Sequence, residues 1–229
     1  RKTRQGRDLG GEFVKSVDSV VENFRPVGLE GWGLAPGSLR KDNPNLIYAR
    51  ISGYGQTGPY AKKPGFASAC EAISGFRYVN GYPGETPVRP NLSIGDTVSG
   101  LHAVIGILMA LRSRDEAIKD NKEGGQVVDV ALYESMFNLL EAVIPDYDGV
   151  GFVRQHSGTT VTGIVPTNTY KCADGKFLVI GGNGDSIFAR LMTAVGRADM
   201  ATDEKYATNT DRVIHEAALD KVLANWCAS

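Results

Sequence analysis

Asp96 is the residue whose surroundings in the sequence most favour chemistry. It lies in the small-residue segment 93–100, which leads into an apolar, periodic stretch over residues 98–114. Such a stretch predicts a buried helix with Asp96 at its N-terminus. A carboxylate there most often caps the helix by accepting the free backbone N–H groups of the first turn. The same N–H groups and the positive helix end can instead keep it ionised and aimed into a cleft as a nucleophile.

The stretch that follows Asp96 has the period of one helix face. Large apolar side chains recur on that face at Val98, Leu101, Val104, Ile105, Leu108 and Met109. Arg112 and Arg114 near its end suit the negative pole of a helix. We therefore expect this helix to be central to the core, with its apolar face buried.

The N-terminal part of the chain alternates between helix and strand patterns. Residues 7–17 predict a short helix and residues 19–24 a short buried strand. A second helix near residues 36–41 precedes a clear strand at 46–51. Strand, helix and strand joined by short links are typical of a parallel sheet covered by helices, so the predicted fold class is α/β.

Two loops of this pattern are candidates for a ligand site. In open α/β sheets ligands bind beyond the carboxyl ends of the strands. The loops that follow the two predicted strands, residues 23–26 and 52–60, occupy that place. Their glycines and prolines are equally typical of ordinary turns, so each loop taken alone leaves both interpretations open.

The remaining sequence predicts further elements and a second domain. Residues 65–75 and 132–143 read as helices and residues 126–130 as a strand. Residues 145–166 lack a helical period and indicate either a linker or a mobile active-site loop. A hairpin over residues 170–180, turned at Asp174-Gly175, then begins what we expect to be a second domain.

Other catalytic motifs are weak or missing in the sequence. Residues 181–185 superficially resemble a phosphate loop before a helix at 186–195, but they lack its spacing and its Lys-Ser/Thr end. They favour a tight turn with Asp185 or Ser186 capping the helix. The G-x-S-x-G elbow of many serine hydrolases does not occur.

Composition bounds the remaining function classes. With 229 residues, 42% of them hydrophobic, the chain can bury a sizeable core. A net charge of −1, with basic and acidic residues interspersed, argues against nucleic-acid binding. Three widely spaced cysteines (Cys70, Cys172 and Cys227) argue for a reducing compartment and against disulfides and zinc, and the dispersed histidines suggest no metal site.

The chain carries neither a leader pattern nor, by our reading, an apolar stretch long enough to span a bilayer, so we expect no membrane partner. It begins at Arg1 on a helix-like pattern and stops without a helix stop signal. We therefore expect it to be part of a longer protein.

Several phrases, in order along nearly the whole chain, resemble the class III CoA-transferase family. They are residues 20–26 (VVENFRP), 43–49 (NPNLIYA), 51–60 (ISGYGQTGPY), Gly95-Asp96 and 124–130 (GGQVVDV), followed by the Asp174-Gly175 hairpin. The family includes formyl-CoA, carnitine and succinyl-CoA:dicarboxylate CoA-transferases, so the resemblance implies a transferase of sulfur-containing groups.

The resemblance also implies an architecture. The family has a Rossmann-like large domain with a parallel sheet, a smaller α+β domain inserted before the chain returns, and two subunits interlocked as a homodimer. Residues 1–150 would be part of the large CoA-binding domain, without its first strand and helix. Residues 151–166 would be a linker or active-site loop, and residues 167–229 the beginning of the small domain.

By the same resemblance Asp96 is the catalytic aspartate. It would attack an acyl-CoA thioester to give an aspartyl anhydride, then an aspartyl-CoA thioester from which a carboxylic acid, most simply a dicarboxylic one, reclaims CoA. Coenzyme A and its acyl thioester are the substrates, and no metal or further cofactor is implied. The residues implied to bind CoA are Asn23, Phe24, Arg25, Ile51, Ser52, Gly53 and Tyr54.

The chain departs from the family pattern at three places and differs from related racemases at a fourth. Pro26-Val27-Gly28 stands where the family usually has Pro-Gly-Val, and Gly31 where formyl-CoA transferase has an arginine. Threonines replace much of the glycine in the segment 159–163, which corresponds to a closing loop. Residues 65–67 read Gly-Phe-Ala, whereas α-methylacyl-CoA racemases of this fold have a Gly-His-Asp phrase that supplies their second acid/base.

Two alternatives to the transferase remain open at this stage. One is such a racemase, which Phe66 disfavours because phenylalanine cannot move a proton. The other is a non-catalytic CoA-binding or oligomerisation module. Arg50, Arg77 and Arg89 could bind a distal substrate carboxylate, but we expect surface charges. The cytoplasm or the mitochondrial matrix is the expected location.

Overall fold

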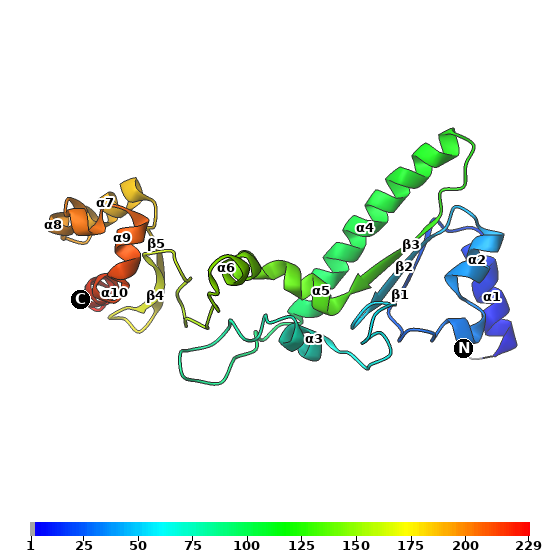
Figure 1. The fold of residues 1–229 in the computed structure, drawn as a ribbon, viewed down its shortest axis with the longest axis horizontal. Coiled ribbons are helices and arrows are strands. Elements are labelled where there is room, and N and C mark those ends of the chain that lie inside the picture. The colour runs from blue at the N-terminus through cyan, green and yellow to red at the C-terminus, as the bar shows by residue number, and fades with distance from the viewer. Residues whose placement is uncertain (1–2) are drawn as a thin grey trace. The chain divides into compact units, whose positions relative to one another are not determined.

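A computed structural model describes residues 3–229 of the chain and divides it into two compact units (Figure 1). The first unit comprises Arg1–Tyr78 and Val88–Val153, and the second comprises Val79–Pro87 and Arg154–Ser229. The short segment of residues 79–87 therefore belongs with the C-terminal part of the chain, although both of its flanks belong to the first unit. Each unit is described separately below.

The first unit is built on a parallel sheet of three strands. These are β1 (Ser19–Glu22), β2 (Ile47–Ser52) and β3 (Gln126–Ala131), in the spatial order β1-β2-β3. Ile47 pairs with Ser19 on one side and with Gln126 on the other. The central strand is almost wholly buried, which agrees with its continuous apolar run. The prediction of an α/β fold with a parallel sheet is confirmed.

Short helices precede and separate the first two strands. They are α1 (Arg4–Val14), the 3₁₀ turn η1 (Glu30–Trp32) and α2 (Pro36–Asp42). The α1 helix begins three residues before the predicted 7–17, because the Thr3 side chain caps it by accepting from the Gly6 N–H at 3.2 Å. Their apolar side chains share one buried cluster with the strands, consisting of Val14, Leu29, Leu39, Leu46 and Tyr48.

The helix that bears Asp96 is the longest element of the structure. It is α4 (Ile94–Lys119), which packs along β2 and β3 and against α3 (Ala67–Ile73) (Figure 1). Its buried residues are all small, namely Gly95, Ser99, Ala103 and Ala110. A Cβ on Gly106 would lie 2.6 Å from a Val128 methyl carbon, so the helix backbone approaches the sheet closely.

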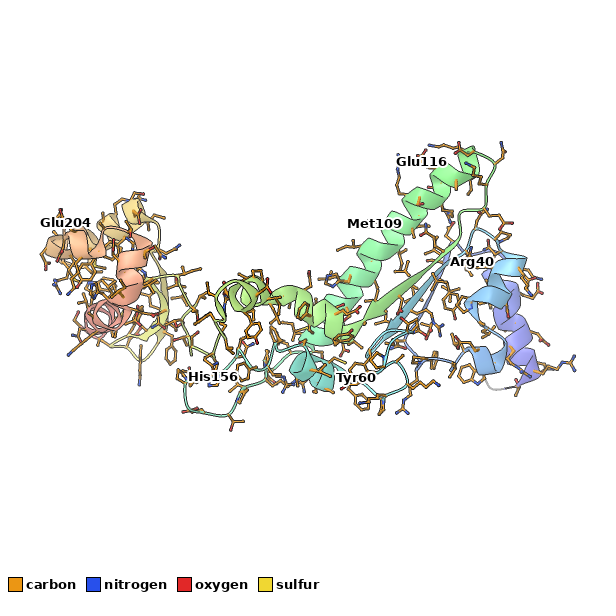
Figure 2. All side chains as sticks on the ribbon, in the orientation of Figure 1. Arg40, Tyr60, Met109, Glu116, His156 and Glu204 are labelled. Atoms are coloured by element: carbon orange, nitrogen blue, oxygen red, sulfur yellow. The ribbon has the colours of Figure 1, made fainter. Side chains whose placement is uncertain are left out.

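The expectation that the large apolar face of this helix is buried was wrong. Leu101, Val104, Ile105, Leu108 and Met109 are between 53% and 68% exposed, and Figure 2 shows Met109 on the side of α4 away from the strands. The 3.6-residue period correctly predicts a helix, but it does not say which face meets the sheet. Here the close approach of backbone to sheet selects the small-residue face.

The α4 helix also corrects the expectation about membrane spans. By length and composition it is long and apolar enough to cross a bilayer, contrary to the reading of the sequence. This is weak evidence for a span, because a helix that packs in a protein core can pass the same test. In this structure α4 packs on two strands of the sheet.

The region after β3 is more broken than predicted. In place of one helix over 132–143 there are α5 (Leu132–Phe137), a 3₁₀ turn η2 (Asn138–Leu140) and α6 (Val143–Val150). The break falls at Glu141, whose φ of 50° lies in the left-handed region and cannot continue a right-handed helix. The expectation of no helix after Pro145 was wrong, because proline is tolerated in the first turn of α6.

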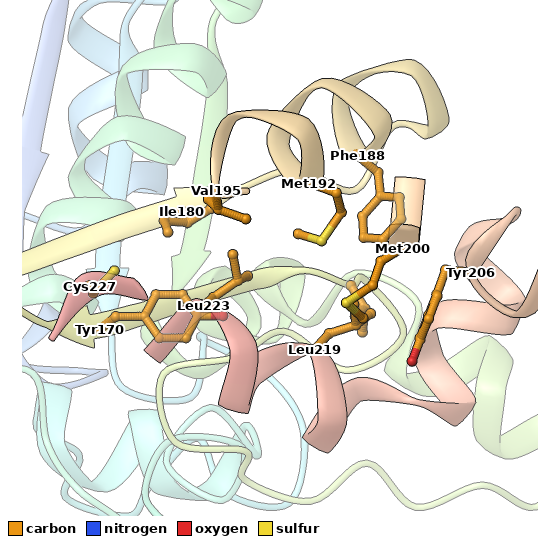
Figure 3. Packing of buried hydrophobic residues seen from close by; sticks show 11 residues of the cluster. Tyr170, Ile180, Phe188, Met192, Val195, Met200, Tyr206, Leu219, Leu223 and Cys227 are labelled. Atoms are coloured by element: carbon orange, nitrogen blue, oxygen red, sulfur yellow. The ribbon is translucent and has the colours of Figure 1, made fainter. Parts of the chain in front are cut away.

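The second unit combines a hairpin with short helices. The hairpin of β4 (Thr167–Lys171) and β5 (Phe177–Gly181) confirms the predicted turn at Asp174-Gly175. The helical elements that follow are α7 (Asp185–Ala194), α8 (Ala198–Ala201), η3 (Glu204–Tyr206), α9 (Asn209–Ile214) and α10 (Glu216–Cys227). Their side chains and those of the hairpin bury a shared core that includes Phe188, Met192 and Leu219 (Figure 3).

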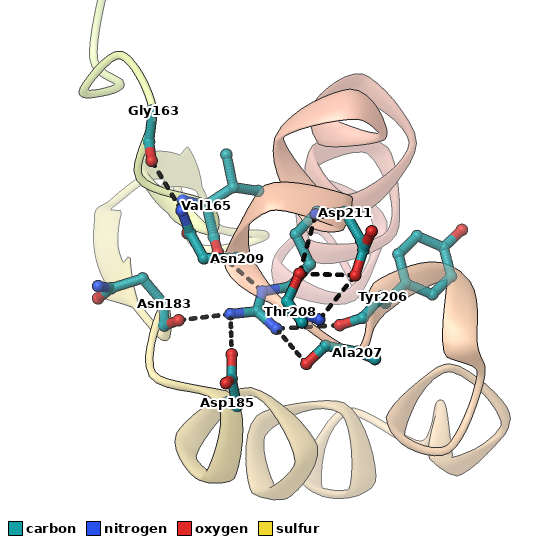
Figure 4. A network of polar contacts seen from close by, with 10 residues as sticks. Gly163, Val165, Asn183, Asp185, Tyr206, Ala207, Thr208, Asn209 and Asp211 are labelled. Atoms are coloured by element: carbon teal, nitrogen blue, oxygen red, sulfur yellow. Dashed lines mark hydrogen bonds and ion pairs between the residues drawn. The ribbon is translucent and has the colours of Figure 1, made fainter.

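A buried arginine connects several segments of the second unit by hydrogen bonds. Arg212 is fully buried, and its guanidinium donates to the backbone oxygens of Val165 and Tyr206 and to the Asp185 carboxylate (Figure 4). The prediction that Asp185 or Ser186 caps α7 was wrong. The N-cap position is Gly184, which has no side chain to offer, and the Asp185 carboxylate serves Arg212 at 2.7 Å instead.

Candidate active site

A cavity of about 550 Å³ opens in the first unit where the strands end. Residues that follow β1, end β2 and follow β3 all contribute to it, as expected for a parallel sheet. Its lining consists of Asn23, Phe24, Arg25, Pro26, Ile51, Ser52, Gly53, Ala61, Lys63, Gly65, Phe66, Ala67, Ser68, Arg89, Asp96 and Leu132.

Seven of the eight predicted site residues line this one cavity. They are Asn23, Phe24, Arg25, Ile51, Ser52, Gly53 and Asp96. Tyr54 does not line it. Its ring packs against those of Tyr60 and Tyr133, with centroids 5.6 and 5.9 Å apart, and it lines a separate, smaller depression. A direct contact between Tyr54 and a ligand in the larger cavity is therefore not part of this geometry.

Asp96 lies inside the first turn of α4 and does not cap the helix. The helix begins at Ile94, so Asp96 is its third residue and the N-cap is Ser93, whose side chain makes no capping hydrogen bond. The N-cap interpretation of Asp96 was therefore wrong. Among residues 3–229 no recorded hydrogen bond uses the Asp96 carboxylate, and the residue is exposed. The carboxylate is thus accessible, and it lies beside the positive end of the helix dipole, which favours a negative charge.

Tight packing at the preceding residue fixes where the helix starts. A Cβ on Gly95 would lie 3.1 Å from the Ala67 Cβ and 3.3 Å from Oε1 of Glu71. The Ser99 hydroxyl donates to the Gly95 carbonyl oxygen at 2.7 Å. Glycine at this position therefore lets the first turn of α4 rest directly on α3, which sets the position of Asp96 in the cavity.

Glu22 is a site residue that the sequence reading missed. It ends β1, is 5% exposed, and accepts from the Phe24 N–H at 2.7 Å and from Nε of Arg50 at 2.6 Å. Arg50 also pairs with Glu30 at 2.7 Å. Burial alone would raise the pKa of Glu30, but the hydrogen bond from Arg50, a backbone hydrogen bond and the Arg50 charge together outweigh it and lower that pKa. Glu22 thus anchors the cavity loop at Phe24.

Arg50 and Arg77 are not surface charges. Arg50 is buried between Glu22 and Glu30, 28 and 20 residues away in sequence. Arg77 is paired at 2.8 Å with Glu71, which is fully buried. The expectation of solvated surface arginines was wrong for these two, because each neutralises a buried carboxylate. An isolated acidic residue at the end of a strand or in a helix gives little sequence signal for such pairing.

The charges that line the cavity are one carboxylate and three cations. Asp96 is the carboxylate, and Arg25, Lys63 and Arg89 are the cations, counted over the lining residues that the structure describes. The Lys63 ammonium lies 3.6 Å from the centroid of the Tyr60 ring, within cation–π range. A cavity with this balance suits an anionic ligand.

Cys70 lies close to the Asp96 carboxylate, and its thiol stays protonated at neutral pH. Burial, then the negative charges of Asp96 and Glu71, raise its pKa to about 11. Its Sγ donates to the Gly53 carbonyl oxygen at 3.2 Å. A protonated thiol is a poor nucleophile, and Cys70 is not among the residues that line the cavity. Over the described part of the chain, no three His, Cys, Asp or Glu residues gather in a metal-binding arrangement.

The chain belongs to CoA-transferase family III, whose sequence profile matches residues 2–229. It is 43% identical over 225 residues to a succinyl-CoA–D-citramalate CoA-transferase of Chloroflexus aurantiacus, covering 98% of this chain and 55% of that protein. It is 34% identical to a succinate–glutarate CoA-transferase of Agrobacterium fabrum, covering 97% of this chain and 54% of that protein.

Solved structures share the fold. A CAIB/BAIF family protein from Brucella suis matches with a TM-score of 0.80 at 34% identity, covering 99% of this chain and 58% of that one. The protein Rv3272 from Mycobacterium tuberculosis matches with a TM-score of 0.83 at 27% identity, covering 99% and 58%. The chain thus spans a little over half the length of the relatives it matches.

One departure from the family pattern, at Val27, and one difference from the racemases, at Phe66, have structural counterparts. Val27, where the family usually has glycine, has a φ of 61°, in the left-handed region that glycine adopts most easily. Phe66 lines the cavity and is 73% exposed, so no proton-transferring side chain stands at that place. The segment 159–163 belongs to the second unit, where Ser157 and Thr160 exchange hydrogen bonds, and its role as a closing loop stays a prediction.

Proposed function

We propose that the protein containing this chain transfers CoA from an acyl-CoA thioester to a small carboxylic acid, with Asp96 as the covalent carrier. The observation that supports this most is that Asp96 is the one carboxylate among the described lining residues of the cavity, free of hydrogen bonds and set at the start of a helix. The named relatives act with succinyl-CoA or succinate and a second acid, which agrees with an acid acceptor.

The first step forms one bond and breaks another. An oxygen of the Asp96 carboxylate attacks the thioester carbonyl carbon, and the C–S bond breaks to release CoA thiolate and leave an acyl-aspartyl anhydride. The thiolate then attacks the aspartyl carbonyl of the anhydride, which releases the donor acid as its carboxylate and leaves an aspartyl-CoA thioester. Neither step needs a net proton transfer.

The second half reverses these steps with another acid. The acceptor carboxylate attacks the aspartyl-CoA thioester, releases CoA thiolate and forms a new anhydride. The thiolate attacks the acceptor carbonyl of that anhydride, which gives the product acyl-CoA and restores the Asp96 carboxylate. The chain supplies the nucleophile and cationic groups for the anionic intermediates, and we propose no cofactor or metal beyond CoA itself.

CoA would bind along the loops that end β1 and β2. Arg25, exposed at the cavity, can hold phosphate oxygens with its guanidinium. Glu22 and Arg50 would keep the neighbouring Phe24 in place. The racemase alternative is less well supported, because a second acid/base opposite Asp96 is not found at Phe66.

Mass spectrometry of the full-length protein tests the proposal. After incubation with an acyl-CoA, the wild type should carry a covalent CoA adduct on the peptide with Asp96, and Asp96→Ala should carry none and lose at least about 10³-fold in turnover. Asp120→Asn, an exposed aspartate at the other end of α4, is the matched control and should behave as wild type. Full turnover by Asp96→Ala would overturn the proposal. Exchange of the α-proton of an acyl-CoA without an acceptor acid would favour the racemase.

We also propose that the full-length protein is a homodimer without nucleic-acid or membrane partners, in the cytoplasm or the mitochondrial matrix. The exposed apolar face of α4 supports an assembly that covers it, since such faces on soluble proteins mark contact surfaces. The three free cysteines support a reducing compartment. Light scattering of the full-length protein tests the dimer, and a monomer at micromolar concentration would contradict it.

A further inference from the structure

Two arginines approach one buried carboxylate beside the cavity, and only one of them is needed to neutralise it. Glu71 is fully buried, and its Oε2 accepts from Nε of Arg77 at 2.8 Å. Nε of Arg89 lies 4.0 Å from the same oxygen, beyond hydrogen-bond length. The Glu71–Arg77 ion pair thus forms at Oε2 without Arg89, and Oε1 of Glu71 has no hydrogen-bond partner among the described residues. The Arg89 guanidinium, at 4.0 Å, keeps its hydrogen-bond donors for another partner.

Arg89 lines the cavity that contains Asp96. Its side chain is 46% exposed, so it is accessible from the cavity yet drawn toward Glu71 by charge. Arg77, Arg89 and Glu71 together carry one excess positive charge. When Asp96 is acylated it loses its own negative charge, so the cavity then holds cations without a protein carboxylate to balance them.

The other two cations of the cavity have different surroundings. Arg25 belongs to the loop after β1, which we propose for CoA, and Lys63 lies over the Tyr60 ring. Arg89 instead lies seven residues before Asp96, on the segment that enters α4. This leaves Arg89 as the cation available to the acyl group that Asp96 receives.

We propose that Arg89 binds the distal carboxylate of a dicarboxylic substrate and thereby selects dicarboxylates over monocarboxylates. The proposal rests on the transferase function proposed above. A guanidinium pairs with a carboxylate through two parallel N–H···O bonds, which a terminal methyl group cannot form. Arg89 is thus a specificity-determining residue, whereas Arg77 neutralises the buried Glu71.

Two donors that differ only at the far end of the acyl chain test the proposal. Succinyl-CoA ends in a carboxylate and butyryl-CoA in a methyl group. The rate of adduct formation on Asp96 is measured with each donor in the full-length wild type, Arg89→Gln, Arg89→Lys and the control Arg112→Gln. Arg112 is 76% exposed and pairs with Glu116 on the same helix, so it reports on the loss of a surface charge.

We expect Arg89→Gln to lower the succinyl-to-butyryl rate ratio on the order of 30-fold, the usual effect of losing a hydrogen-bonded charge. Arg89→Lys should recover part of this ratio, and Arg112→Gln should leave it unchanged. If Arg89→Gln slows both donors equally, the proposal is overturned and Arg89 serves CoA or the fold. If it slows neither donor, the proposal is overturned and Arg89 has no role in this step. Thermal melting of each variant shows whether folding is intact, which we expect because Arg77 still neutralises Glu71.

A binding measurement separates this proposal from the proposed function. Calorimetry gives the dissociation constants of succinate and butyrate without any turnover. Weaker succinate binding in Arg89→Gln, with butyrate binding unchanged, supports the carboxylate site. This holds even if the wild type forms no adduct, because a missing adduct contradicts only the proposed transferase mechanism. Succinate binding that is equal in wild type and Arg89→Gln would sink the Arg89 proposal while adduct formation still supported the transferase.

Discussion

The backbones of Gly53 and Gly65 lie in direct contact at the cavity. A Cβ added to Gly53 would come 2.7 Å from Cα of Gly65, and one added to Gly65 would come 2.9 Å from Cα of Gly53. Both glycines line the cavity, so this contact joins the loop after β2 to the segment before α3. On each side the atom that an added Cβ would meet is a backbone atom, which cannot rotate away as a flexible side chain could.

Gly53→Ala should therefore widen the site and weaken the fold. We expect a loss of about 2 kcal/mol in the free energy of unfolding, typical of overpacking, together with a raised KM for acyl-CoA. Urea denaturation and steady-state kinetics measure the two effects. Gly37→Ala is the control, because a Cβ on Gly37 meets nothing within 4 Å, and it should be neutral or stabilising. Equal behaviour of the two variants would show that the close contact is unimportant.

Val27→Gly should stabilise the protein. Val27 adopts a φ of 61° and is 73% exposed, so its side chain gains little burial in return for a left-handed backbone. Relief of that strain, less the greater freedom of glycine in the unfolded chain, should raise the free energy of unfolding by about 1 kcal/mol. Urea denaturation measures it. An unchanged or lower stability would mean that the loop holds Val27 in this conformation without strain.

Cys70 should make stability depend on alkaline pH. Its folded pKa, about 11, lies above the ordinary value of 9.0, so the unfolded chain loses the thiol proton first as pH rises. The stabilisation is complete below pH 9 and is lost between pH 9 and 11, with a slope of up to about 1.4 kcal/mol per pH unit from this group. Urea denaturation across this range should show a smaller slope in Cys70→Ala. Parallel curves for wild type and variant would contradict the raised pKa.

Asp96 should also control the reactivity of Cys70. Its negative charge is the second cause of the raised thiol pKa, after burial. Asp96→Asn should therefore lower the pH at which Cys70 begins to react with a thiol reagent. Mass spectrometry of the labelled peptide identifies Cys70 separately from the half-buried Cys172. The same pH profile in both proteins would show that the Asp96 charge does not affect the pKa of Cys70.

Glu22→Gln should cost more than the loss of a surface pair. The substitution leaves Arg50 buried without its full charge partner and weakens the bond to the Phe24 N–H, so we expect a loss of about 3 kcal/mol in the free energy of unfolding and weaker CoA binding. Glu12→Gln removes an exposed pair with Lys15 and should cost less than about 1 kcal/mol. Similar losses in the two variants would argue that burial of Glu22 adds nothing.

The sheet of the first unit could be predicted because its signals are local. Residues 46–51 form a continuous apolar run between turn residues, and the observed β2 is Ile47–Ser52. The parallel arrangement follows from the helix that joins β1 to β2. The same local logic located the hairpin at Asp174-Gly175, where glycine has a φ of 81°.

Long-range packing decided what the sequence could not predict. The start of α4 depends on the contact between Gly95 and Ala67, so the position of Asp96 within the first turn was not readable from its neighbours. Which face of α4 meets the sheet depends on the fit of small side chains to Val128 and its neighbours. The pairing of Arg50 with Glu22 and Glu30 joins three separate segments, and no pattern in any one of them indicates it.

The assignment of residues 79–87 to the second unit means that the chain passes between units three times, at 78–79, 87–88 and 153–154. Within that unit the Gly158 N–H donates to the Gly81 carbonyl oxygen at 2.7 Å, so the short segment is held by its neighbours there. A single proteolytic cut at 153–154 would therefore not separate two self-sufficient pieces. The second of these passages, at 87–88, is separated from Arg89 only by Val88, so the residue proposed to choose the substrate follows almost directly on a segment of the other unit.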